Sequence, residues 1–397
     1  RAAAFLSDVM RNSGKPELRI LSYKGEQLFV LVISETPDEL KPCFNSKLGL
    51  PRGACIRDRS SDRPLTDEEM RAFIRNSALY KFDQTQAKGP SLEDLNLSKV
   101  KRLLEKSADK VGRKDLDNEP TLEVLKNLGI VDNFEGEDTP TVGGYLIFSD
   151  KLPQMQKEFR RYVIRCVRYG GVSVTSPIID SQDVDGTLDE QIDAVYQFVL
   201  RNISLKARIE GSKRVEEYEY PPEALRELIA NAVIHRDYMI TETYTQVNIF
   251  SNRIEILNPG NLPPGVTVEN IIDSQYSRNE VIAALLKDLD YLEEYGRGIN
   301  IVFSKMNEWN LLEPIFKNSS NSFKVILFQE KSNELNDRQI SIWYTVQKKG
   351  RITAKECEEM FPNFTRPTIN KDLQKLTSIG LLVSKGSSSS TFYEPQY

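Results

Sequence analysis

Residues that bind transition metals are scarce in this sequence. Its 397 residues include a single histidine and four cysteines, Cys43, Cys55, Cys166 and Cys357, which lie far apart and form no C-x-x-C pair. A structural zinc site needs four closely grouped ligands, and such scattered residues do not supply them. We therefore expect lone, buried and reduced thiols.

Long apolar runs are also missing. No window comes near about eighteen uninterrupted apolar residues, so the sequence predicts no transmembrane helix and no membrane partner. We find no signal peptide, which favours a cytoplasmic location. The chain opens on Arg1 within what reads as a helix, and we expect the natural N-terminus to lie further upstream.

Two further absences narrow the function. No G-x-x-x-x-G-K-S/T segment occurs, so the loop that cradles phosphate in helicase motors is absent and the sequence excludes helicase activity. The formal net charge is −5 and the isoelectric point is near 5.4, which argues against a protein that coats nucleic acid with its whole surface. One basic module on an acidic body remains compatible with this balance, and the length favours about three domains.

The pattern of the N-terminal residues predicts a β-hairpin and one further short strand. Residues 18–34 read as two strands with a turn at Lys24-Gly25, and residues 54–57 read as a further short strand. Thr66 is expected to cap a helix. Residues 81–120 are polar, with one amphipathic helix around 97–104, which is typical of a connection between domains.

The middle of the chain alternates helical and strand patterns. Apolar faces and turn signals predict, in chain order, a strand at 163–167, a helix at 188–203, a helix from Pro221 or Pro222, strands at 245–250 and 253–257, a helix at 281–292 and a strand at 322–328. We predict an α+β sandwich with helices over one face of a sheet. The polar residues 329–335 read as a linker.

Three short patterns within this region are weak singly and specific as an ordered set. Glu227 and Asn231 are four residues apart on a predicted helix, so both project from one face. Such a pair is usually a solvated face, and an isolated G-x-G is often only a turn. The other two patterns are an N-P-G after a strand and a G-R-G before a helix, formed by Asn258, Gly260, Gly296, Arg297 and Gly298.

This order resembles the GHKL superfamily of ATP-binding domains, which is shared by gyrases, heat-shock chaperones, mismatch-repair proteins and histidine kinases. The segments ELIANAVIHRDY, NRIEILNPGNLP, SRNEVI and EEYGRGI resemble the branch labelled RecG-like C-terminal, or helix-turn-helix regulator with an ATP-binding domain. The resemblance covers roughly residues 139–328.

The resemblance implies ATP and Mg²⁺ as cofactors and a role for each residue. Glu227 would orient and deprotonate the attacking water, and Asn231 would give an oxygen to Mg²⁺. Asn258 would bind the adenine, while Gly260 would let the backbone pass close to the base. Gly296 and Gly298, with Arg297 between them, would offer amides to phosphate as part of a lid.

The chain departs from the superfamily in two places. Asn258 stands where the usual adenine-binding residue is Asp. The second glycine-rich motif of the superfamily is reduced to G-R-G. Nucleotide binding without turnover, or a fold that no longer binds nucleotide, therefore stays open. His235 is the only histidine, which excludes autophosphorylation on a separate phosphoacceptor helix. Next to Arg236 and Asp237 at a helix end, we expect a structural role for it.

The C-terminal block resembles the winged helix-turn-helix of bacterial and archaeal regulators. We predict helices at 337–348, 353–360 and 365–378, and then a hairpin with Gly386 in its tip. The third helix would enter the major groove of double-stranded DNA, with Lys348, Lys349 and Arg351 at the flank. The side chains best placed to meet bases or phosphates are Thr365, Arg366, Thr368, Asn370, Lys371 and, in the wing, Lys385. The acidic Glu356, Glu358 and Glu359 keep a purely protein-binding role open.

The N-terminal segment GACIRDRSSDRPLTDEEM resembles the end of the Schlafen AlbA-like domain. The E-x-x-x-E-F-K opening of that domain is absent, so we predict no nuclease. Arg57, Arg59 and Arg63 could bind phosphate or form a solvated turn.

These inferences predict a partial AlbA-like module at 1–80, a helical connector at 81–135, a GHKL-like domain at 136–330 and a winged helix at 336–397. The function we predict is a transcriptional regulator, expected to be a homodimer, in which ATP or a related nucleotide gates DNA binding. The alternatives are a weak ATPase or an anti-sigma-like protein kinase that uses the winged helix for targeting, and a scaffold that binds only proteins.

Overall fold

The chain divides into two compact units. The computed structural model describes residues 10–11, 17–23, 26–32, 43–45, 47–48, 53–58, 61–66, 69, 81–111, 120–210, 213–263, 265–274, 276–292, 298–387 and 390–397. Residues 1–82 with 262–266 form the first unit, and residues 83–261 with 267–397 form the second. The predicted four-part division at other boundaries stays a prediction.

The first unit is built from short antiparallel strand pairs. β2 (Glu17–Tyr23) pairs with β3 (Glu26–Val32), which confirms the predicted hairpin, while β5 (Cys55–Asp58) pairs with β6 (Ser61–Pro64) and β1 (Met10–Arg11) with β4 (Phe44–Asn45). Thr66 and Glu69 exchange backbone-to-side-chain hydrogen bonds of 2.9 and 3.2 Å, the capping box expected of a helix start. The rest of that predicted helix lies outside the described residues.

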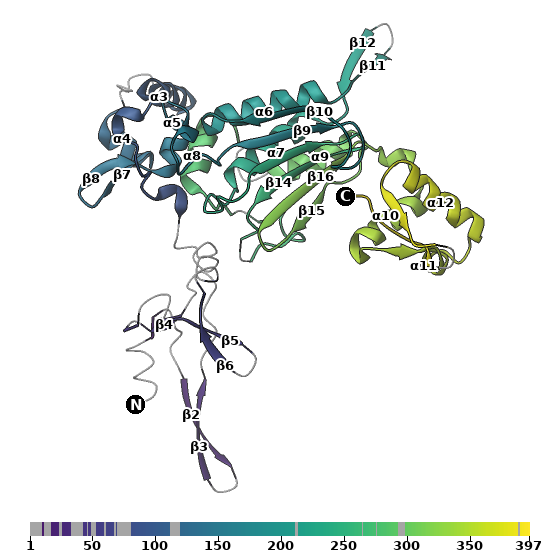
Figure 1. Ribbon diagram of the computed structural model, residues 1–397, viewed down its shortest axis with the longest axis horizontal. Helices are drawn as coiled ribbons and strands as arrows, with labels where there is room; N and C mark the ends of the chain where they lie inside the picture. The colour runs from purple at the N-terminus through teal and green to yellow at the C-terminus, as the bar shows by residue number, and fades with distance from the viewer. Residues whose placement is uncertain are drawn as a thin grey trace. The chain divides into compact units, whose positions relative to one another are not determined.

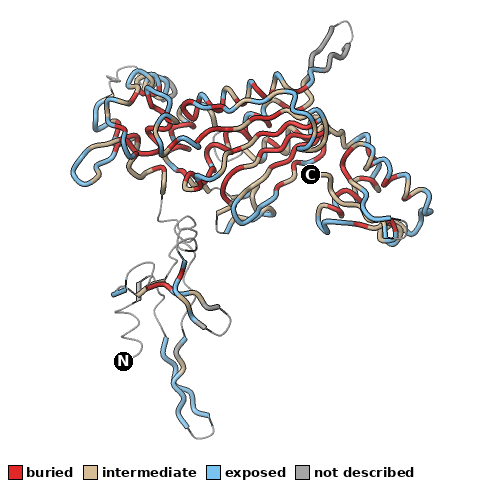
Figure 2. Tube along the Cα trace, viewed as in Figure 1, coloured by how far each residue is buried: buried red, intermediate tan, exposed pale blue. Residues whose placement is uncertain are grey.

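A six-stranded mixed sheet is the centre of the second unit. β9 (Ile164–Tyr169) runs parallel to β13 (Thr245–Ile249), and the other neighbours are antiparallel. The spatial order of the strands is β10 (Ile178–Val184), β9, β13, β14 (Arg253–Pro259), β16 (Ser322–Phe328) and β15 (Ile315–Asn318). The two central strands, β13 and β14, are almost wholly buried (Figure 2), as expected of strands covered on both faces.

Three helices lie over one face of this sheet: α6 (Leu188–Asn202), α7 (Pro222–Ile234) and α9 (Gly298–Glu308) (Figure 1). The apolar side chains Ile192, Val195, Phe198 and Val199 lie on one face of α6 and are all buried, as the predicted amphipathic helix at 188–203 requires. The mixed α+β class with helices over a sheet is therefore confirmed. Because side chains alternate along a strand, Ile254, Ile256 and Asn258 of β14 share one face and Arg253 and Glu255 share the other.

Residues 83–150 pack beside this core rather than only leading to it. They contain α3 (Leu97–Val111), α4 (Leu122–Asn127), the hairpin β7 (Val131–Phe134) and β8 (Glu137–Pro140), and α5 (Val142–Phe148). The carboxylate of Asp83 accepts hydrogen bonds from the backbone N–H groups of Val281 and Ile282, at 2.7 and 3.2 Å, and so caps α8 (Glu280–Asp288). Lys99 of α3 forms an ion pair of 2.6 Å with Asp189 at the start of α6.

The C-terminal residues form a small module of three helices and a three-stranded sheet. Its helices are α10 (Asp337–Lys349), α11 (Ala354–Met360) and α12 (Arg366–Ser378), within one residue of the predicted bounds, and Thr353 caps the start of α11. β17 (Ile352–Thr353) and β18 (Leu382–Lys385) flank β19 (Phe392–Pro395). Trp343, Ile369 and Leu373 are fully buried in the core of this module.

The module is docked on the sheet face opposite the helices. Phe328 of β16 meets the Trp343 ring edge-on, with centroids 5.2 Å apart, and the ring of Tyr397 packs beside both. Asn252, which precedes β14, donates a buried hydrogen bond of 2.8 Å to the carbonyl of Gly380. Lys317 of β15 lies over the Tyr397 ring at 3.8 Å.

The cysteines differ in part from expectation. Cys166 and Cys357 are buried free thiols, and burial raises the pKa of each to about 12. Cys55 is also free but exposed, because it lies in a short two-stranded pair, so the prediction of a buried thiol is wrong there. In the described part of the chain, no group of three or more potential ligands could hold a metal ion, and no helix is long and apolar enough to cross a membrane.

Replacing Asp83 tests whether residues 83–150 support the core. Asp83→Ala leaves two backbone N–H groups at the start of α8 without their acceptor, and we expect the free energy of unfolding to fall by about 1–3 kcal/mol in urea denaturation. Asp83→Asn keeps an oxygen in the same place and should lose less. Unchanged stability of Asp83→Ala would contradict the capping role.

Candidate functional site

Helix α7 brings Glu227 and Asn231 together. The amide nitrogen of Asn231 donates a hydrogen bond of 2.9 Å to Glu227 Oε1, across one helical turn. Glu227 is only 6% exposed, which is rare for a carboxylate, whereas Asn231 is partly exposed. Since the hydrogen bond uses the amide nitrogen, the amide oxygen of Asn231 is the atom that would face a cation.

The start of α9 approaches this pair so closely that any side chain on Gly298 would overlap Glu227 as it is placed. A Cβ atom built on Gly298 would lie 1.6 Å from Glu227 Oε1 and 2.4 Å from its Cδ. Both atoms belong to the buried carboxylate end of Glu227, so a methyl group there would force this carboxylate to move and to strain its hydrogen bond with Asn231. Of the predicted G-R-G residues, Gly298 therefore lies beside Glu227, while Gly296 and Arg297 are outside the described residues.

Asn258 and Gly260 lie at the end of β14. Asn258 is buried on the helix side of the sheet, and its side-chain oxygen accepts a hydrogen bond of 2.9 Å from the Thr245 hydroxyl of β13. Gly260 has φ of 101°, which favours glycine, and a Cβ there would lie 2.6 Å from the Cβ of Asp237. The chain thus turns tightly against the segment that follows α7.

A buried polar cluster that the sequence analysis assigned no role joins these two places. Asp237 is 3% exposed and forms an ion pair of 3.1 Å with Arg278, which also donates to the carbonyl of Asn261 at 2.8 Å. The amide of Asn279 donates to the carbonyls of Ile234 and Arg236, at 2.6 and 2.9 Å. The cluster fixes the end of α7 against the N-P-G turn and the start of α8.

The signal for this cluster was present in the sequence as the H-R-D and S-R-N triplets within the quoted segments. His235 itself is exposed at the C-terminal cap of α7, where its backbone N–H donates a hydrogen bond of 2.9 Å to the Asn231 carbonyl. The structural role expected for this histidine stays a prediction.

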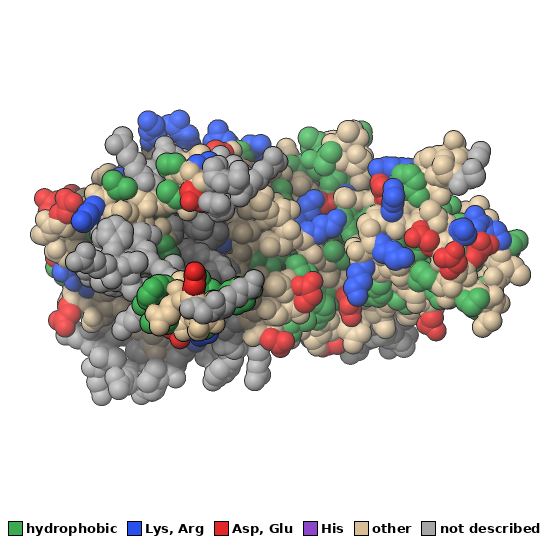
Figure 3. Space-filling view, turned by 90° about the horizontal axis from the view of Figure 1, so that it is seen from below, with side chains coloured by type: hydrophobic (Ala, Val, Ile, Leu, Met, Phe, Trp, Pro, Cys, Tyr) green, Lys and Arg blue, Asp and Glu red, His purple; other side chains and the backbone are tan. Residues whose placement is uncertain are grey.

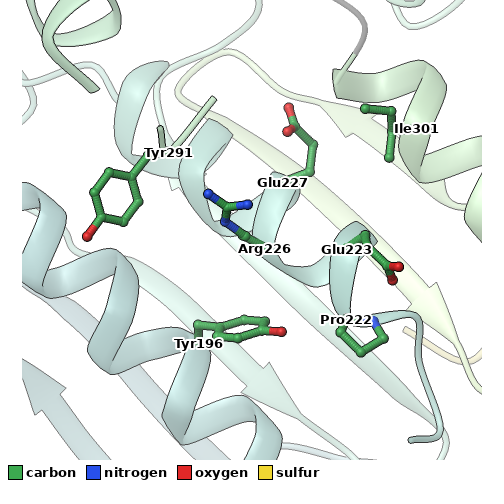
Figure 4. A pocket seen from close by; sticks show the side chains of 7 residues that line it. All are labelled: Tyr196, Pro222, Glu223, Arg226, Glu227, Tyr291 and Ile301. Carbon is green, nitrogen blue, oxygen red and sulfur yellow. The ribbon is translucent and has the colours of Figure 1, made fainter. Parts of the chain in front are cut away.

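A pocket of about 250 Å³ opens beside Glu227 on the outer side of the helix layer (Figure 4). Helices α6, α7 and α9 and the turn after α8 contribute to its wall. The residues that line it are Tyr196 of α6, Pro222, Glu223, Arg226 and Glu227 of α7, Tyr291 after α8, and Ile301 of α9. The volume is several times that of a water molecule, about 30 Å³ in the liquid, so the space suits part of a larger ligand.

The predicted DNA-contacting side chains of the C-terminal module are accessible. Thr365, Arg366, Lys371 and Lys385 are exposed, and Thr368 and Asn370 are partly exposed on α12. Two of the cations are paired: Arg366 with Glu358 and Lys385 with Glu394, both at 2.6 Å. Figure 3 shows basic and acidic side chains intermixed over this end of the molecule.

Of the three N-terminal arginines Arg57, Arg59 and Arg63, the last is the one whose side chain the structure describes. Arg63 forms an ion pair of 2.6 Å with Glu69, which lowers the pKa of that carboxyl to about 2. Arg57 lies on β5, and Arg59 is outside the described residues.

Comparison with known proteins indicates an ATPase-like domain in the second unit. A family model described as "Putative ATP-dependent DNA helicase recG C-terminal" matches residues 242–327, which include β13, β14, α8, α9 and most of β16. The matched segment contains Asn258, Gly260 and Gly298 but begins after Glu227 and Asn231. A search of curated proteins finds no match.

The fold is similar to a solved structure from Corynebacterium diphtheriae, the DIP2311 protein. The TM-score is 0.50 with 17% sequence identity, and the alignment covers 96% of this chain and 76% of that one. At this identity the likeness concerns the fold alone.

The contact between Gly298 and Glu227 can be measured by a double-mutant cycle. Gly298→Ala should lower the free energy of unfolding by about 1–3 kcal/mol, because the added methyl group overlaps the buried carboxylate. In a Glu227→Ala background the obstacle is gone, so the same substitution should cost at least about 1 kcal/mol less. Strictly additive effects in urea denaturation would contradict the close approach.

Proposed function

We propose that this chain is a nucleotide-responsive DNA-binding regulator, in which the second unit's core binds Mg²⁺ and ATP and the C-terminal module is a winged helix that binds double-stranded DNA. The observation that carries the nucleotide half is the Glu227–Asn231 pair facing the glycine start of α9. The family match to residues 242–327 also supports it, since that segment contains Gly298 but neither Glu227 nor Asn231.

The donor set fits a magnesium nucleotide. Mg²⁺ takes few protein ligands and prefers oxygen, and the amide oxygen of Asn231 lies next to a carboxylate that is held in place. When bound, the cation would neutralise phosphate charge. Glu227 would accept a proton from an attacking hydroxyl, and Asn258, steadied by Thr245, would present its amide to the base.

The order of elements supports the winged-helix half of the proposal. A helix, a short strand, two further helices and a closing hairpin follow one another, and β19 lies between β17 and β18. α12 has its Ile369, Leu373 and Leu376 buried in the module and its Arg366 and Lys371 exposed. This is the arrangement in which a third helix can be presented to the major groove.

Strand β14 connects the candidate nucleotide site with the C-terminal module. Its C-terminal end carries Asn258 and leads to Gly260, while Asn252, next to its N-terminal end, holds Gly380 of the module. Glu255, on the module side of the strand, pairs with Arg253 at 2.6 Å and with Lys324 at 2.7 Å. A nucleotide-dependent shift of this strand would move the module, and two modules in a homodimer would then be spaced differently on a palindromic site.

A second candidate is phosphoryl transfer to water or to a protein hydroxyl, and the pocket beside Glu227 favours it. The buried carboxylate lines a space that an acceptor could enter. Steady phosphate release that is abolished by Glu227→Ala would support this activity. We do not propose a helicase, because no G-x-x-x-x-G-K-S/T segment occurs in these residues.

Nucleotide binding is tested by thermal unfolding with increasing Mg-ATP. A ligand that binds only the native state stabilises it by about 2.7 kcal/mol at a hundred times its Kd, so the midpoint should rise with ATP concentration. Asn231→Ala should abolish the rise. Asn307→Ala, an exposed amide on α9, should retain it. A wild-type midpoint that stays flat up to millimolar ATP would refute the nucleotide half.

DNA binding is tested by fluorescence anisotropy with a labelled random-sequence duplex at several salt concentrations. Lys371→Ala should weaken binding and reduce the slope of log affinity against log salt by about 1, since one phosphate contact is lost. Lys355→Ala removes another exposed positive charge, on α11, and should change neither. Equal loss in both variants would show that α12 does not face the DNA, and added Mg-ATP should change the wild-type affinity if the core gates the module.

A further inference from the structure

The charge of the pocket beside Glu227 is unusual for a place next to a triphosphate. Two carboxylates, Glu223 and Glu227, belong to its wall, and among the lining residues that the structure describes Arg226 is the only cation. Glu223 acts over this space: the pKa of Tyr196 is raised, first by burial and then by the negative charge of that carboxylate. A terminal phosphate entering the pocket would meet repulsion from both acids unless Arg226 offsets it.

Arg226 is placed to do so. It precedes Glu227 on α7, and Figure 4 shows the two side chains leaving neighbouring positions of the helix toward the same space. Its backbone is fixed by a helix whose neighbouring residues Leu225, Glu227 and Leu228 are all buried, whereas its own side chain is exposed. The guanidinium can therefore reorient while its anchor stays still.

Among the residues that the structure describes, the hydrogen-bond partner of Arg226 is a backbone oxygen. Its Nη2 donates to the carbonyl of Asp290, which has a left-handed φ of 65° in the turn that follows α8. The Asp290 carboxylate is bound elsewhere, to Lys106 at 2.5 Å. A neutral carbonyl lacks the opposite charge that phosphate offers to a guanidinium, and it cannot accept two parallel hydrogen bonds, so the guanidinium would exchange one partner for the other at a net gain.

We infer that Arg226 binds the terminal phosphate of the nucleotide and so lets the site distinguish ATP from ADP. This rests on the proposed nucleotide site. Planar guanidinium groups bind phosphate oxygens in pairs, a geometry that lysine does not reproduce. With ADP bound, no phosphate enters the pocket and Arg226 keeps its hydrogen bond to the Asp290 carbonyl. With ATP bound, the terminal phosphate draws Arg226 toward Glu227. The assignment gives the regulator a reason to respond to the triphosphate and not to the base alone.

The test compares Mg-ATP with Mg-ADP on the full chain by isothermal titration calorimetry. Wild type should bind ATP more tightly than ADP. Arg226→Ala should lose about ten- to hundredfold in ATP affinity, with ADP affinity changed by less than about threefold, because only the terminal contact is removed. Arg226→Lys keeps the charge and should fall between the two.

Two controls separate a contact from a change of charge. Lys287→Ala removes one exposed cation from α8, outside the pocket, and should leave both affinities unchanged. Glu223→Gln removes a negative charge from the pocket wall and should tighten ATP more than ADP. If Arg226→Ala lowers folding stability too far for calorimetry, Arg226→Gln retains most of the side chain and carries the same expectation.

The outcomes are distinguishable. Wild-type protein that binds neither nucleotide refutes the proposed nucleotide site itself. Wild-type protein that prefers ATP, with Arg226→Ala or Arg226→Gln keeping that preference, overturns the assignment of Arg226 alone. Equal losses for ATP and ADP in these variants also overturn it, because they would mean that Arg226 acts on the shared part of the ligand or on the fold.

Discussion

Burial of strand β14 on both faces is the constraint on which the second unit depends. Toward the helices it presents Ile254, Ile256 and Asn258, and toward the C-terminal module Arg253 and Glu255, all of them nearly inaccessible to solvent. A register slip by one residue would move the apolar set to the charged side and the ion pairs among the helices. One strand therefore fixes both the position of Asn258, the candidate adenine-binding residue, and the surface on which the C-terminal module packs.

The polar groups near the candidate site are used for positioning as much as for chemistry. Asp237 and Arg278 compensate each other in a buried place, and Asn279 satisfies two carbonyls at the end of α7 that the helix itself leaves open. Breaking one partner of such a pair leaves the other charge buried without compensation. The geometry of Glu227 and Asn231 thus depends on residues that need not touch a nucleotide, which is one reason why the H-R-D and S-R-N triplets accompany the E-x-x-x-N pattern in this chain.

Local physics made much of the fold predictable, and contacts between distant segments set the limit. The E-x-x-x-N pair follows from helical spacing, and the C-terminal helices have caps such as Thr353 that mark their ends in the sequence. Asp83 and α8 are almost two hundred residues apart, so nothing near either reveals the cap, and residues 83–135 read as a simple connection. The edge strand β10 (Ile178–Val184) was missed because its pattern is largely exposed and polar. At the site, the approach of Gly298 to Glu227 needs the packing of α9 on α7, which no spacing within either helix encodes.

The hairpin of β2 and β3 has a practical consequence for work with the first unit. Leu18, Ile20 and Phe29 share one face of a two-stranded ribbon and are between 54% and 68% exposed. Among the described residues no third strand pairs with this ribbon, and two strands alone do not make a stable sheet. An apolar ribbon whose edges are unpaired is a template for pairing with other chains. Residues 1–82 expressed in isolation would therefore favour self-association through these edges, and charged substitutions at Ile20 or Phe29 are the natural way to keep such a fragment monomeric.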